Sequence, residues 1–104
     1  MATLRFSQRA EADLLEIGAY TLRRWGEQQV IRYLDEIEAC CTMLADNSTL
    51  GRAAADIRPG LWRMECGSHV VFYWRETGGI LVSRILHRRM MPERHVIGDE
   101  EEST

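Results

Sequence analysis

Residues 58–90 constrain the fold of this chain more than any other stretch. Three runs rich in β-branched and aromatic residues lie there, at Leu61–Cys66, 69–75 and 80–87. Short segments rich in glycine, serine and threonine separate these runs. Turn formers between such runs are typical of strands that follow one another through tight turns. The stretch therefore predicts an antiparallel three-stranded meander.

Two amphipathic segments precede the meander. Apolar residues recur at helical spacing over residues 8–24 and again over 27–45, with only Trp25-Gly26 between the two segments. A break this short predicts an antiparallel helix hairpin, whose apolar face needs a sheet to cover it. With a short strand expected at 3–6, the sequence predicts an α+β fold. In it, an N-terminal strand and the hairpin pack on a three- to four-stranded, mainly antiparallel sheet.

Length and composition indicate a single domain. The chain has 104 residues, of which 45% are hydrophobic, and this is enough for a real core. We assign residues 1–97 to the domain and expect 98–104, with four consecutive acidic residues, to be a disordered tail. Both faces of the expected sheet carry apolar residues, although a two-layer domain exposes one face. We therefore expect a partner to cover the second face.

The charged residues and cysteines limit the possible chemistry. All thirteen basic residues are arginine, and the net charge of −3 becomes +1 when the four tail acids are left out. No apolar run approaches the length of a membrane span, so we expect a cytoplasmic protein without membrane contact. Cys40 and Cys41 are adjacent, Cys66 stands alone, and no spacing is typical of a zinc site. The expectation is buried free thiols, with no metal and no cofactor.

A basic cluster ends the last run of the meander, at His87, Arg88, Arg89 and Met90. Arginine forks bind phosphates or carboxylates, so this cluster is the candidate binding surface. Basic and aromatic residues from the strands and from the segment after them are expected to join it: Arg63, Tyr73, Arg84 and His95. His87 and His95 are the candidates for acid–base chemistry because histidine titrates near neutral pH. No spacing in the chain specifies catalysis.

The order of strand, helix hairpin and meander resembles the toxins of the RelE/ParE superfamily, and the local sequence resembles the ParE branch. Four segments carry this resemblance and together cover most of residues 7–95. They read AEADLLEIGAYTLRRWGEQQVIRYL, LADNSTLGR, IRPGLWRMECGSHVVFYW and ILVSRILHRRM, the last followed by a downstream histidine.

The resemblance implies the toxin of a bacterial type II toxin–antitoxin system, which causes growth arrest and serves plasmid maintenance. ParE toxins bind DNA gyrase, leave cleaved DNA held on it, and are not themselves enzymes. A ParD-like antitoxin wraps the toxin in a hetero-oligomer and carries the DNA-binding half, so this chain alone is expected to bind no specific DNA sequence. The cluster at 87–90, with Arg63, Tyr73, Arg84 and His95, is then the target surface. Trp25, Tyr33 and Leu34 are expected to contact the antitoxin.

Two alternatives stay open. Toxins of the RelE branch cut mRNA on the ribosome, and His95, Arg63 and Arg88 would be the catalytic candidates for that reaction here. This chain departs from the RelE pattern, because it has no lysine and has Val70 where an arginine is expected. The other alternative is an inactive toxin that only binds its antitoxin.

Overall fold

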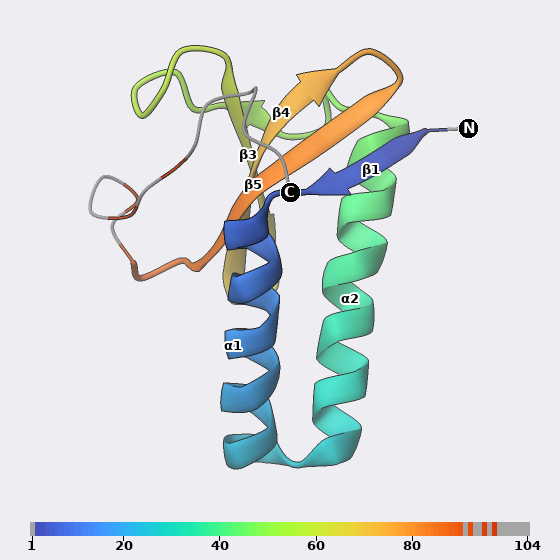
Figure 1. Ribbon diagram of the computed structural model, residues 1–104, viewed down its shortest axis with the longest axis vertical. Helices are drawn as coiled ribbons and strands as arrows, with labels where there is room; N and C mark the ends of the chain where they lie inside the picture. The colour runs from blue at the N-terminus through green and yellow to red at the C-terminus, as the bar shows by residue number, and fades with distance from the viewer. Residues whose placement is uncertain (1, 91, 93–94, 96, 98–104) are drawn as a thin grey trace.

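A computed structural model describes residues 2–90, 92, 95 and 97. Two helices form an antiparallel hairpin on one side of a sheet (Figure 1), so the predicted α+β fold is confirmed. The elements in chain order are β1 (Thr3–Phe6), α1 (Gln8–Trp25), α2 (Glu27–Asp46), β2 (Arg52–Ala53), β3 (Leu61–Cys66), β4 (His69–Glu76) and β5 (Gly79–His87).

The sheet has five strands in the order β1-β5-β4-β3-β2, which is more than the three or four predicted. β1 runs parallel to β5, and the other neighbours are antiparallel. The additional strand is β2, which pairs its two residues with Trp62 and Arg63 of β3. It was not predicted, because two residues are too few to show a strand period.

Ser7 fixes the start of the hairpin relative to the sheet. Its side chain accepts a hydrogen bond from the Ala10 amide at 3.0 Å, as expected of a helix N-cap. The same hydroxyl donates to the Ser83 carbonyl of β5 at 2.7 Å. One buried hydroxyl thus joins the first turn of α1 to the strand that carries the candidate surface.

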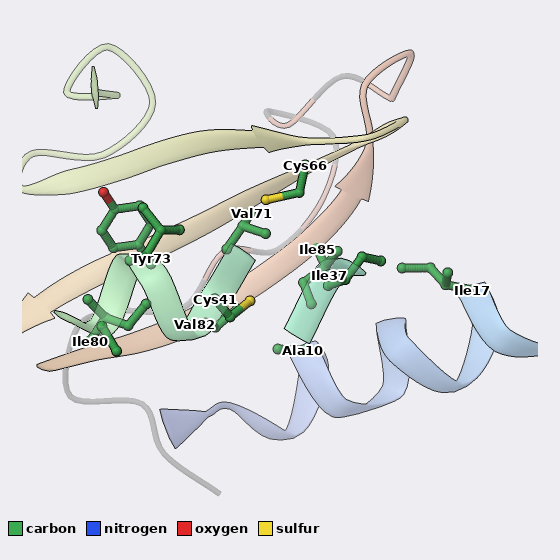
Figure 2. Close-up of a cluster of buried hydrophobic side chains, with 12 residues drawn as sticks. Ala10, Ile17, Ile37, Cys41, Cys66, Val71, Tyr73, Ile80, Val82 and Ile85 are labelled. Atoms are coloured by element: carbon green, nitrogen blue, oxygen red, sulfur yellow. The ribbon is translucent and has the colours of Figure 1, made fainter. Parts of the chain in front are cut away.

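The main core lies between the hairpin and the sheet (Figure 2). Ala10 and Ile17 of α1 and Ile37 and Cys41 of α2 pack against residues of the central strands, which include Val71, Tyr73, Val82 and Ile85. Tyr73 has no exposed surface, and its hydroxyl donates to the Ser48 carbonyl at 2.8 Å. Tyr73 is therefore a core residue with an internal hydrogen-bond partner, and not a surface residue as expected.

The chain itself covers the second face of the sheet, which corrects the expectation that a partner would do so. The buried residues there are Ala54, Leu61, Val70, Phe72, Trp74, Leu81, Leu86 and Ile97, and Ile57 packs against them. Ala54 and Ile57 come from the connection between β2 and β3. The Arg58 guanidinium donates to the Ile97 carbonyl at 3.0 Å, which joins Ile97 to this connection. The predicted tail, 98–104, lies outside the described residues.

The cysteines only partly match the expectation of free thiols. Cys40 of α2 and Cys66 of β3 form a disulfide, with 6.4 Å between their Cα atoms. Their sequence separation of 26 concealed this pairing, because sequence spacing does not show that α2 passes the end of β3. Cys41 is a buried free thiol, and burial raises its pKa to about 12. It therefore acts as a small apolar residue.

Candidate interaction site at the end of β5

The segment after β5 is held by a local set of hydrogen bonds. The Arg88 amide donates to the Ser68 carbonyl at 3.0 Å, and the Met90 amide donates to the His87 carbonyl at 2.8 Å. The Arg89 amide donates to Nδ1 of His87 at 3.1 Å. Arg88, Arg89 and Met90 are nevertheless exposed. The backbone is thus fixed while three consecutive side chains face solvent.

A pair of histidines in edge-to-face contact lies directly beside this segment. His69 is opposite His87 in the β4–β5 ladder, and their rings meet edge to face with centroids 5.3 Å apart. The Ser68 amide donates to the Tyr33 hydroxyl oxygen at 3.0 Å, which leaves the hydroxyl proton free to bond Nδ1 of His69. The pair therefore connects α2, through Tyr33, to the end of β5.

Burial keeps His69 uncharged. Loss of solvent, together with the nearby His87, lowers the pKa of His69 from its ordinary value of 6.5 to about 4, although the charge of Asp13 opposes the shift. Burial also raises the pKa of Tyr33, so this phenol stays protonated as a donor. At neutral pH the wall formed by His69 therefore carries no charge and is a poor source of protons.

A groove runs between α1 and the end of β5. It has a volume of about 630 Å³ and is lined by Glu16, Ile17, Ala19, Tyr20, Arg23, His69, His87 and Met90. An adjoining hollow of about 90 Å³ shares several of these residues and also contacts Arg84 and His95. Four residues predicted for the target surface, Arg84, His87, Met90 and His95, thus line one hollow.

The α1 side of the groove was not predicted from the sequence. Glu16, Tyr20 and Arg23 lie on α1, more than sixty positions before His87, and they meet the strand end only through the packing of α1 on β5. The available signal was Tyr20, which flanks the apolar stripe of the helix and is 56% exposed. His69 was not among the residues predicted for the site.

Arg84 is paired within the protein. Its Nε and Nη2 atoms donate to the two carboxylate oxygens of Asp13, at 2.8 and 2.9 Å, and the Ile85 amide donates to the same carboxylate at 2.9 Å. The two side chains are 14% and 9% exposed. The charge of Arg84 is thus balanced by α1, and this arginine serves the framework beneath the hollow.

Arg63 lies apart from the strand-end cluster. Its guanidinium sits over the Phe72 ring at 5.5 Å, and its buried Nε has no hydrogen-bond partner among the residues that the structure describes. Arg63 lines neither the groove nor the hollow that holds His95. Of the three residues considered for RNA cleavage, His95 lines this hollow, whereas Arg63 and Arg88 do not.

The residues expected to contact an antitoxin differ in exposure. Trp25 is 67% exposed at the end of α1, whereas Tyr33 and Leu34 are partly buried against the main core. Other large hydrophobic side chains of the hairpin are also exposed: Leu15, Tyr20, Leu22, Ile31 and Met43. The hairpin thus exposes more apolar side chains than the three residues predicted to contact an antitoxin.

Within the described part of the chain, no group of three or more histidine, cysteine, aspartate or glutamate residues is placed to hold a metal ion. In the same part, neither helix is both long and apolar enough to cross a membrane.

The fold and sequence match those of one toxin class. Residues 4–92 match the family model described as ParE toxin of type II toxin-antitoxin system, parDE. Toxin ParE1 of Caulobacter vibrioides is 38% identical over 96 residues, which cover 92% of this chain and 99% of that protein. Toxin ParE1 of Mycobacterium tuberculosis is 42% identical over 92 residues, or 86% of this chain and 93% of that protein.

A solved structure titled "Chromosomal ParDE TA system from P. aeruginosa" has the same fold. Its TM-score is 0.72 at 18% identity, and the match covers 84% of this chain and 96% of that one. The chain belongs to the ParE toxin family of type II toxin–antitoxin systems. The resemblance stated from the sequence is confirmed.

Proposed function

We propose that this protein stops bacterial growth by binding DNA gyrase in the cytoplasm and stabilising its cleaved DNA complexes. In this proposal it catalyses no reaction itself, and a ParD-like antitoxin neutralises it in a hetero-oligomer. Membership of the ParE family supports the proposal. Two matched relatives are named toxins, and the alignments with this chain cover 99% and 93% of their lengths.

The observation that carries the proposal is the fixed and exposed strand end. Backbone hydrogen bonds hold Arg88 and Arg89, while both side chains face solvent. A fixed backbone reduces the conformational freedom that this segment loses when its guanidinium groups bind a carboxylate or phosphate. We assign the target surface to residues 87–90 together with His95. Arg84 and Tyr73 are left out because both are engaged inside the protein.

The test is a gyrase supercoiling and DNA-cleavage assay with the purified protein, with and without its ParD-like antitoxin. We expect trapped cleavage complexes that disappear when antitoxin is added. Arg88→Ala/Arg89→Ala should lose this activity in folded protein. If folded wild-type protein that binds antitoxin leaves gyrase unaffected, the proposal is wrong. Ribosome-dependent mRNA cleavage would then be assayed, with Arg63, Arg88 and His95 substituted in turn.

We place the antitoxin on the helix hairpin. The exposed apolar residues there, Leu22, Trp25 and Ile31, suit an amphipathic segment that folds as it binds. Trp25→Ala should weaken antitoxin binding without changing the free energy of unfolding. Tyr33→Phe and Leu34→Ala should instead affect stability, because the first removes the hydroxyl that bonds Ser68 and His69 and the second removes a side chain that packs on the core. If Trp25→Ala leaves antitoxin affinity unchanged, this placement is wrong.

A further inference from the structure

The groove between α1 and the end of β5 is not explained by the strand-end arginines alone. At about 630 Å³ it lies within the size range of pockets that enclose a ligand or the anchoring side chain of a partner. One wall is α1, with Ile17, Ala19 and Tyr20. The other is formed by Met90 and the two histidines, whose rings meet edge to face. The groove therefore joins exposed helix surface to the proposed target surface.

The lining favours an apolar occupant. Tyr20 is 56% exposed and Met90 is 44% exposed, so both present large side chains to solvent that a partner could cover. His69 is neutral at physiological pH because burial lowers its pKa to about 4. The neutral His69 ring, Tyr20 and Met90 together suit an aromatic or aliphatic side chain better than a charged one.

The rim supplies positive charge. Arg23 lies in the last turn of α1 and lines the groove, while the exposed Arg88 and Arg89 follow the histidine wall. Glu16 is the acidic member of the lining. A segment that places a carboxylate near Arg23 or the strand-end arginines while its apolar side chain enters the groove would match this distribution.

We infer that the groove receives a segment of the target protein that carries a large apolar side chain next to a carboxylate. This inference rests on the proposed function and adds a second contact with the target protein, next to the strand-end surface. His87 and Met90 belong to both the groove and the strand-end surface, so one bound segment can span the two. The exposed apolar residues assigned to the antitoxin, Leu22, Trp25 and Ile31, are not among the groove's lining residues.

A charge-reversal pair tests the rim. Arg23→Glu alters a lining residue, whereas Arg24→Glu makes the same change on the next residue, which contacts Trp25 and does not line the groove. Both arginines are exposed in the last turn of α1, so the loss of favourable helix-dipole interaction is equal. We expect Arg23→Glu to raise the concentration needed for half-maximal gyrase inhibition about tenfold or more, and Arg24→Glu to change it less than about twofold.

A second pair tests the apolar wall. Tyr20→Ala removes a groove residue, and Leu15→Ala removes an exposed side chain of the same helix that does not line the groove. Tyr20→Ala should weaken gyrase inhibition about tenfold, while Leu15→Ala should leave it within about twofold. Circular dichroism and thermal unfolding of all four variants confirm that each is folded.

The outcomes separate this inference from the proposed function. Equal inhibition by wild type, Arg23→Glu and Tyr20→Ala would overturn the groove while leaving gyrase as the target. If Arg23→Glu and Tyr20→Ala lost antitoxin binding but still inhibited gyrase, the groove inference would also be overturned. The groove would then belong to the antitoxin. A folded wild-type protein with no effect on gyrase would overturn the proposed function and the choice of groove partner together.

Discussion

Arg84 and the pair Arg88–Arg89 lie within one short run of sequence but occupy opposite environments. Arg84 is largely buried and is held by both oxygens of Asp13. Arg88 and Arg89 are exposed, and their backbone rather than their side chains is fixed. The first arginine therefore joins α1 to β5, whereas the other two are available to a partner. Residue type and proximity in sequence thus do not decide which arginine binds a target.

An irregularity in the pairing of β4 with β5 contributes to the different environments of these arginines. A register irregularity lies between Phe72 and Tyr73 of β4, so that Phe72 is opposite Arg84 while Tyr73 is opposite Val82. Ser83 is therefore the additional residue on β5, and its carbonyl receives the Ser7 hydroxyl. Bulges re-aim side chains and bend strands. Beside this bulge, Arg84 meets α1, and the strand then continues regularly to His87.

Removing Asp13 should have the largest effect on stability. Asp13→Ala leaves a mostly buried guanidinium without its carboxylate and the Ile85 amide without its acceptor, at a cost of about 3–5 kcal/mol in the free energy of unfolding. Urea denaturation measures this loss. Glu16→Ala, which removes an exposed acid one turn later, is the control and should change stability by less than about 0.5 kcal/mol. A loss below about 1 kcal/mol for Asp13→Ala would show that Arg84 is not part of the framework.

Reducing the Cys40–Cys66 disulfide should have the next largest effect. The bond closes a loop of sequence separation 26 and holds α2 to the β3–β4 turn, so reduction should lower the free energy of unfolding by about 3 kcal/mol. Denaturation with and without dithiothreitol measures the change, and Cys40→Ala should show no further loss on reduction. Under denaturing conditions the oxidised protein should titrate one thiol, that of Cys41. Three titratable thiols would contradict the pairing.

Much of the fold was predictable because local signals agree with one another. The hairpin, its Ser7 cap and the strand Leu61–Cys66 follow from helical period, capping chemistry and turn residues. β2 and the Cys40–Cys66 pairing were not predicted, because both depend on tertiary contacts that leave no periodic pattern. The covered second face was misread for a related reason. Apolar periodicity shows that a face is buried but not whether the same chain buries it.

The site was predictable at the strand end and not across the groove. His87, Arg88, Arg89 and Met90 are contiguous, so the sequence presents them as one cluster. Tyr20 and Arg23 join them only because α1 packs on β5. Arg84 and Tyr73 were assigned to the surface by residue type, whereas the structure gives each an internal partner. Alternation along a strand could not reveal those partners, because one lies on α1 and the other follows α2.

Acidification should lower the stability of the fold through the buried His69. His69 faces Tyr33 of α2, His87 of β5 and, more distantly, Asp13 of α1, and its folded-state pKa is about 4. The unfolded chain therefore binds more protons between pH 6.5 and pH 4, so the free energy of unfolding should fall as pH is lowered through this range. Urea denaturation at several pH values measures the slope. His69→Gln should reduce it, and an unchanged slope would show that His69 is not protected from protonation.

The exposed arginines should have the smallest effect on stability and a large one on function. Arg88→Ala and Arg89→Ala keep the backbone amides that bond Ser68 and His87, so each should change the free energy of unfolding by less than about 0.5 kcal/mol. Gyrase inhibition by the double variant should nevertheless fall at least about tenfold. Asp13→Ala should show the opposite pattern, in which the free energy of unfolding falls and gyrase inhibition by the protein that stays folded does not. A double variant that unfolds easily would show that the strand end is part of the framework, and that the distinction from Arg84 is one of degree.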